Sequence, residues 1–172
     1  MISERAASSL RSALHKAGRL RLVQRPDGDQ VNISGVPAQE LLACAPDAVL
    51  ITISSLSFHL LVLLGVHDSE AARAYFGEDA FGEIANLTCG VIGQELQQVF
   101  PDLGMSTPAT ISGASLPHLP SLQPLLLDGC RMEINDSVQV SALLCLLGAG
   151  DIDFQLEVQE EDLACSGELE LF

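Results

Sequence analysis

Two side chains that could do chemistry lie three residues apart near the middle of the chain, the carboxylate of Glu83 and the carboxamide of Asn86. In a helix this spacing places both on one face, because one turn takes about 3.6 residues. A carboxylate can bind a cation, and a carboxamide can donate and accept hydrogen bonds without a charge. The pair predicts a surface for a close partner and leaves the type of reaction open.

The segment that would position this pair, Asp79 to Val99, is predicted to be one amphipathic helix. Its apolar arc would face the core, with Glu95 on the apolar side as an exception. The residues of this arc are Phe81, Ile84, Ala85, Thr88, Val91, Ile92, Leu96 and Val99. Nearly opposite lies a polar ridge made of Asp79, Glu83, Asn86, Gly90 and Gln97.

Three glycines in this helix, Gly82, Gly90 and Gly93, are poor choices for stability alone. Each costs a helix interior about 1 kcal/mol relative to alanine. They indicate that something outside the helix must approach its backbone closely.

Composition narrows the class of partner. The 172 residues are 48% hydrophobic, which is ample for a folded core, and carry a formal net charge of −15. This charge argues against nucleic acid and anionic membranes, which bind clustered Lys and Arg. Aromatic residues make up only 4% of the chain, so stacking platforms for bases are not expected.

No metal or nucleophile motif is present. The five cysteines form no CxxC pair and are predicted to be reduced, with Cys89 buried, which indicates a cytoplasmic compartment. The four histidines form no HExxH or HxH motif, and no phosphate-binding glycine loop or GxSxG turn occurs. We therefore expect no cofactor or metal site of the chain's own.

Before the long helix, the pattern predicts a first helix over Ser3–Lys16 that stops at Gly18. Alternation then predicts a strand over Arg19–Arg25, with Gln30–Ser34 as its hairpin partner. A second hairpin and a short helix follow. Their predicted bounds are Val49–Ile53 with Phe58–Val66, and Ser69–Phe76 capped by Asp68 and ended by Gly77.

After the long helix, a strand is expected within Met105–Gly113 and a loop over Leu116–Pro124. Three further strands are predicted, at Arg131–Ile134, Val138–Leu147 and Ile152–Val158. Helices and strands are thus mixed. The fold class expected is α+β, a largely antiparallel β-sheet packed against long helices.

The amino-acid sequence around Glu83 and Asn86 resembles that of a known family. Asp79–Asn86 (DAFGEIAN), then Gly90, then Ser106–Gly113 (STPATISG), is similar to the CheC/CheX/FliY family of chemotaxis phosphatases, and most of all to its CheX-like branch. That family carries D-A-x-G-E-I-x-N on a helix, followed by a strand with P-T-x-I-x-G. The likeness spans about 48–113.

The resemblance implies one CheX-like domain over residues 1–172. Within it, the N-terminal helix and hairpin (1–46) are poorly matched, and the acidic tail (159–172) is expected to be mobile. It also implies a homodimer formed by joining sheets, for which the apolar strand Val138–Leu147 would be suited.

For function, the resemblance implies a phosphatase acting on the phospho-aspartate of a CheY-like response-regulator receiver domain. Asn86 would orient the attacking water, and Glu83 would pair with a receiver lysine. The receiver would supply Mg²⁺. Further contacts to the partner would come from Asp79, Gly90, Gly93 and Gln97.

Two alternatives stay open, because the family often continues Gly-Asn-x-Lys where this chain has Gly90-Val91-Ile92-Gly93. One is a non-catalytic module that binds a receiver or another protein with the same helix surface. The other is a scaffold similar to the flagellar-switch members of the wider family.

Overall fold

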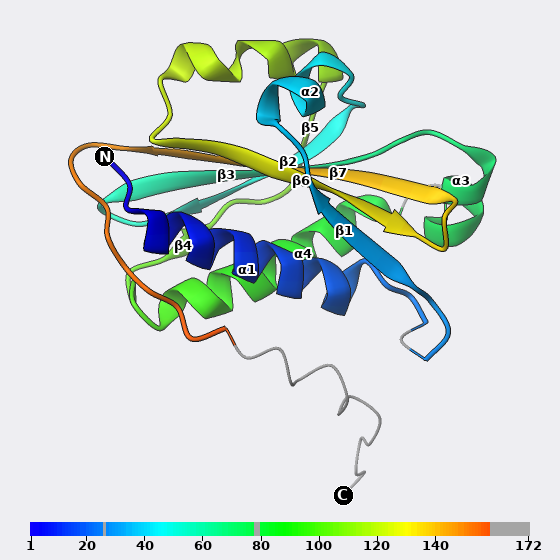
Figure 1. Ribbon diagram of the computed structural model, residues 1–172, viewed down its shortest axis with the longest axis horizontal. Coiled ribbons are helices and arrows are strands. Elements are labelled where there is room, and N and C mark those ends of the chain that lie inside the picture. Colours follow the sequence, from blue (N-terminus) through cyan, green and yellow to red (C-terminus); the bar gives the residue numbers. More distant parts are fainter. Residues whose placement is uncertain (26, 78–79, 159–172) are drawn as a thin grey trace, which may run out of the picture.

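The computed structural model describes residues 1–25, 27–77 and 80–158. Within these ranges the chain forms one seven-stranded antiparallel sheet in the order β1-β6-β7-β3-β2-β4, with β5 also paired to β2 (Figure 1). The strands are β1 (Val31–Gly35), β2 (Ala48–Ser54), β3 (Phe58–Val66), β4 (Gly104–Met105), β5 (Ala109–Ile111), β6 (Leu126–Ile134) and β7 (Val138–Gly148). This confirms the α+β prediction.

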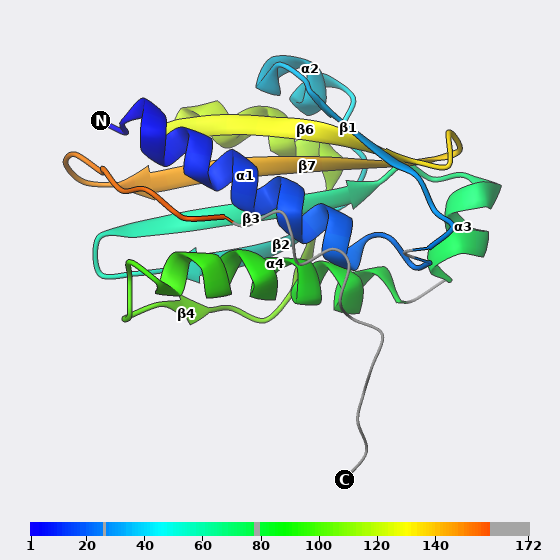
Figure 2. The same cartoon turned by 60° about the horizontal axis from the view of Figure 1, so that its bottom comes forward.

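Helices cover both faces of the sheet. The long helices α1 (Glu4–Arg21) and α4 (Phe81–Gln97) lie side by side on one face (Figures 1 and 2). The short helix α2 (Ala38–Ala43) and the 3₁₀ helix η1 (Gly113–Leu122) lie on the other face, and α3 (Glu70–Phe76) lies at one end of the sheet. No helix among the described residues is long and apolar enough to span a bilayer.

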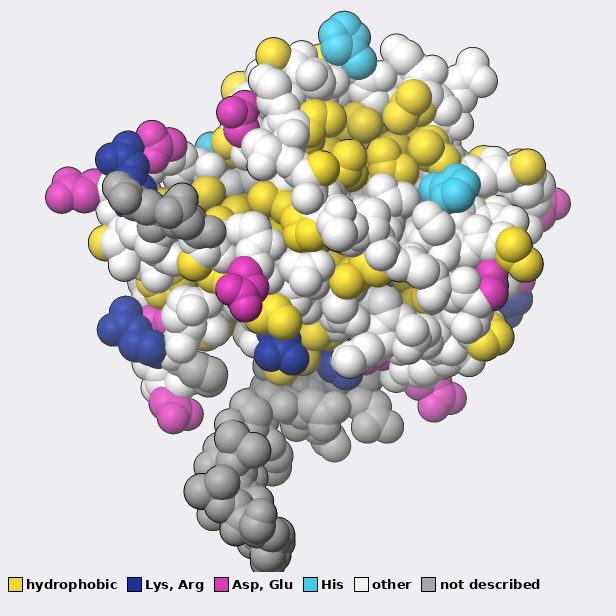
Figure 3. Space-filling view, turned by 180° about the vertical axis from the view of Figure 1, so that it is seen from behind, with side chains coloured by type: hydrophobic (Ala, Val, Ile, Leu, Met, Phe, Trp, Pro, Cys, Tyr) yellow, Lys and Arg dark blue, Asp and Glu magenta, His cyan; other side chains and the backbone are white. Residues whose placement is uncertain are grey.

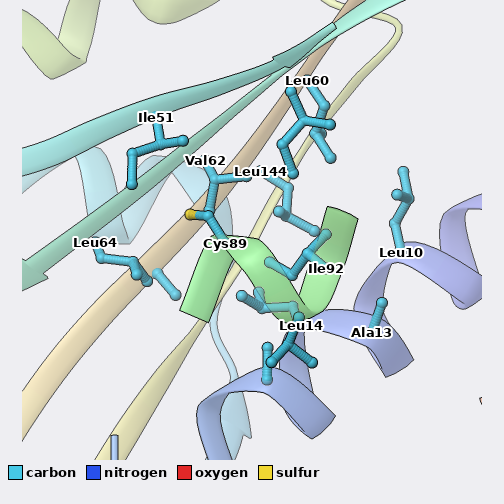
Figure 4. Packing of buried hydrophobic residues seen from close by; sticks show 14 of the residues in the cluster. Leu10, Ala13, Leu14, Ile51, Leu60, Val62, Leu64, Cys89, Ile92 and Leu144 are labelled. Carbon is cyan, nitrogen blue, oxygen red and sulfur yellow. The ribbon is translucent and has the colours of Figure 1, made fainter. Parts of the chain in front are cut away.

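The main core lies between the sheet and the two long helices. Cys89 and Ile92 of α4 are fully buried between sheet residues such as Val62 and the side chains of α1, including Leu14 (Figure 4). Burying one large aliphatic side chain contributes about 1.5–3 kcal/mol. This packing therefore fixes α4 on the sheet.

The two central strands, β3 and β7, are apolar on both sides because helices cover both faces. The β2–β3 hairpin is confirmed, with Val49 opposite Leu64. The short helix α3 also ends as predicted, at Gly77 with φ of 80°. Its N-cap, however, is Ser69, whose Oγ accepts from the amide of Ala72 at 3.0 Å.

The predicted strand over Arg19–Arg25 is wrong, because α1 continues through Gly18 to Arg21. Gly18 does not stop the helix. A Cβ there would lie 2.5 Å from Sδ of the buried Met132, so glycine allows close packing of α1 on β6. The second half of the predicted hairpin does form a strand, β1, which pairs with β6 instead.

Two predictions after α4 are also wrong. The segment Ile152–Val158 forms no ladder among the described residues, only one bridge between Ile2 and Ile152. Its alternating burial comes from lying across α1, where the Leu156 amide donates to Ser9 Oγ at 3.1 Å. The predicted loop Leu116–Pro124 is mostly η1.

The sheet order contradicts the suggestion that Val138–Leu147 joins two sheets. β7 lies between β3 and β6 and is paired along both edges, with Leu146 opposite both Leu60 and Leu126. A strand without a free edge cannot pair with a second chain. The homodimer itself stays a prediction.

Gly113 provides a test of a close backbone contact in this fold. A Cβ at this position would lie 2.3 Å from the carbonyl oxygen of Ala45, and the Gly113 amide donates to Asp47 Oδ1 at 2.8 Å. We expect Gly113→Ala to lower the free energy of unfolding by about 2 kcal/mol. Urea denaturation would measure this. Gly35→Ala, where the Cβ meets nothing within 4 Å, should change it by less than about 0.5 kcal/mol.

Candidate functional site

Helix α4 buries the predicted arc. Ala85, Thr88 and Ile92 are fully buried, and the Thr88 hydroxyl donates to the Ile84 carbonyl at 2.8 Å, so no polar atom of this residue is left unpaired in the core. Val99 is the one error, because it follows the end of the helix and is 40% exposed.

Glu95 lies on the apolar side of α4 because its carboxylate pairs with a side chain of α1. Its Oε1 accepts from Lys16 Nζ at 2.8 Å, and its Oε2 accepts from Gln98 Nε2 at 3.1 Å. The two charged side chains are only 10% and 12% exposed. A buried charge of this kind is tolerated only when it is paired, so the contact fixes how α4 is rotated against α1.

The opposite side of α4 carries the candidate site. Glu83 and Gln97 are exposed, whereas Asn86, Gly90 and Gly93 are partly exposed. The fifth predicted contact, Asp79, lies outside the described residues. The structure therefore brings together along one helix the predicted site residues that it describes.

Within the described ranges, neither the side chain of Glu83 nor that of Asn86 makes a hydrogen bond or ion pair to another residue. Most other charged side chains of the two long helices are paired, as Arg5 is to Asp153 and Arg11 is to Asp128. An acid and an amide that are accessible and have no partner within the described fold are available to a partner from outside.

Among the described residues, no second group of side chains with catalytic geometry accompanies this pair. The three buried thiols of the described part of the chain do not favour nucleophilic chemistry, because burial raises the pKa of Cys89 and of Cys130 to about 12 and that of Cys145 to about 11. His67 bonds to Ser141 at 2.8 Å, and burial lowers its pKa. Across residues 1–25, 27–77 and 80–158, no three His, Cys, Asp or Glu side chains cluster to hold a metal ion.

Sequence reasoning missed one part of this surface. Met105 of β4 and Leu103 border the side of α4 that carries Gly90 and Gly93. In the sequence, the segment Met105–Gly113 follows the helix closely. This closeness alone does not predict on which side of α4 the strand lies.

No protein-family model matches the chain, and no curated protein sequence matches it. Solved structures do match. A chain of the CheX–CheY–BeF₃–Mg²⁺ complex from Borrelia burgdorferi is 13% identical with a TM-score of 0.54, and the match covers 81% of this chain and 96% of that one. A CheC-like superfamily protein from Shewanella sp. PV-4 is 14% identical with a TM-score of 0.51, over 85% and 99% of the two chains.

Substituting the two glutamates of α4 is expected to change the free energy of unfolding by very different amounts. Glu95→Ala leaves Lys16 buried without this partner and should lower the free energy of unfolding by about 3 kcal/mol. Glu83→Ala and Asn86→Ala should each change it by less than about 0.5 kcal/mol, because both side chains project from the fold. Urea denaturation at pH 7 distinguishes the cases. A loss of 2 kcal/mol or more at Glu83 would show that this side chain supports the fold.

Thiol reactivity gives a second test of the packing. With a pKa of about 12, Cys89 holds almost no thiolate at pH 8 and is also inaccessible, whereas Cys44 is exposed. Iodoacetamide followed by peptide mass spectrometry should modify Cys44 within minutes and Cys89 only after unfolding in urea. Rapid modification of Cys89 in the native protein would contradict the burial of this face of α4.

Proposed function

From its CheX-like fold, we propose that this chain is a phosphatase that hydrolyses the phospho-aspartate of a response-regulator receiver domain. The observation that carries the proposal is the accessible pair Glu83 and Asn86, one turn apart on α4, whose side chains have no partner among the described residues. The structural match to a chain of a CheX–CheY complex supports a CheY-like receiver as the partner.

Hydrolysis of an aspartyl phosphate needs few catalytic groups from the enzyme. A water oxygen forms a new bond to phosphorus while the bond from phosphorus to the aspartate oxygen breaks, which yields aspartate and inorganic phosphate. The proton released by water passes to phosphate or solvent. Because an acyl phosphate is already activated, positioning the water in line is a large part of the catalysis.

Asn86 is suited to that positioning. Its side-chain carbonyl can accept a hydrogen bond from the water, while its NH₂ can donate to a phosphoryl oxygen or to the partner. No charge develops on the amide, so its function does not depend on its own protonation. Its partial exposure on α4 leaves it able to enter a partner's cleft.

Glu83 is suited to fix the position of the receiver relative to α4. Its exposed carboxylate lies one turn before Asn86, where it can bind a receiver lysine near the phosphorylated aspartate. The receiver would also supply Mg²⁺, which neutralises phosphoryl charge when bound. On the enzyme side, binding through α4 would exclude disordered solvent from the acyl phosphate.

A phosphate-release assay tests the proposal. Receiver domains from the same organism would be phosphorylated with acetyl phosphate and mixed with the chain. We expect wild type to accelerate phosphate release from a cognate receiver, and Asn86→Ala to reduce that acceleration about 100-fold or more because the water is no longer held. Glu83→Ala should raise KM about tenfold through loss of a charge-assisted contact.

Asn32→Ala is the matched control, since it removes an exposed asparagine from the edge strand β1. Its rate should equal wild type. Unchanged turnover in Asn86→Ala would overturn the catalytic assignment. Receiver binding by wild type without accelerated release would identify the non-catalytic module instead, the alternative that the altered segment Gly90–Gly93 keeps open.

A further inference from the structure

A groove of about 130 Å³ runs beside the candidate site, between α4 and the edge strand β4. Gly90 and Gly93 form its helix side, and Ile53, Leu103 and Met105 form its apolar side. Gln94 and Gln97 border it with exposed amides. Its lining contains no charged residue, although the chain carries a net charge of −15.

The fold itself does not require glycine at either helix position. A Cβ added at Gly90 or at Gly93 meets nothing within 4 Å, unlike Gly18 in α1, where it would collide with Met132. Alanine would favour the helix at both sites. The absent side chains therefore keep the groove open toward solvent.

The groove continues the ridge that carries Glu83 and Asn86. Gly90 lies four residues after Asn86 and Gly93 three further on, so one side of α4 leads from the pair into the groove. A stable protein interface covers about 800 Å² on each partner, far more than two side chains provide. A protein bound over Asn86 must contact neighbouring surface, and the groove is an adjacent concave part of it.

Resting on the proposed function, we infer that this groove receives one apolar side chain of the receiver, projecting beside its phosphorylation site. Uncharged walls exclude a charged occupant, and Met105, an apolar side chain 43% exposed on an edge strand, would be covered on binding. The volume suits a single side chain, since a cavity of roughly 150 Å³ holds a benzene ring. The amides of Gln94 and Gln97 can bind the backbone next to it.

Charged side chains are unevenly distributed over one face of the molecule. Seen from behind, most Lys, Arg, Asp and Glu side chains are distributed around the outline of the molecule, and apolar and uncharged groups occupy much of the middle (Figure 3). An apolar anchor with a polar border is the usual composition of a protein interface.

Gly93→Ala separates binding from folding, because it should stabilise the chain and weaken the complex. We expect Tm to rise by about 3 °C from helix propensity. The affinity for the receiver, locked with beryllofluoride and Mg²⁺, should fall about tenfold by calorimetry because the new methyl group occupies the groove. Met105→Gln, on the opposite wall, should also weaken binding about tenfold.

Ser12→Ala is the control for stabilisation alone. It improves helix propensity at an exposed position of α1, outside the groove, and should leave affinity within twofold of wild type. Wild-type affinity in both Gly93→Ala and Met105→Gln would overturn the groove assignment while leaving the proposed function standing. If wild type neither binds nor dephosphorylates any receiver, the proposed function and the groove's occupant fail together.

Discussion

The buried ion pair between Lys16 and Glu95 is the constraint on which the site depends. At 10–12% exposure both charges need partners, and the contact between them holds α1 and α4 in one rotational arrangement. The same rotation places Cys89 and Ile92 against the sheet. Glu83, exposed, and Asn86, partly exposed, lie on the opposite side of α4 as a consequence of how the core packs.

Sequence periodicity predicted this arrangement where the decisive forces are local. The apolar arc of α4, the position of Glu95 on its apolar side and the β2–β3 hairpin follow from short-range patterns that burial then satisfies. The turn Asn135–Asp136, with φ of 51° and 54°, is likewise a local preference of Asn and Asp. The candidate pair could be located on one helix surface, but its chemistry came from a family resemblance and not from spacing.

Contacts distant in sequence account for the errors. Alternation over Arg19–Arg25 suggested a strand, yet Met132, more than a hundred residues later, packs on Gly18 and lets α1 continue. The alternation in Ile152–Val158 is real burial, but it is burial on α1 and against Phe100 instead of in a ladder. The wall that β4 contributes to the groove depends on the pairing of Met105 with Ile53, which no local pattern specifies.

The strand order also bears on how the chain avoids aggregation. Its two most apolar strands, β3 and β7, lie in the middle of the sheet, whereas the strands at its margins, β1, β4 and β5, are short and largely exposed. Long apolar strands pair readily with other chains whenever their edges are open. Before the sheet is complete, a net charge of −15 contributes electrostatic repulsion between chains. Resistance to edge-to-edge pairing is therefore a property of the finished sheet and of the chain's charge together.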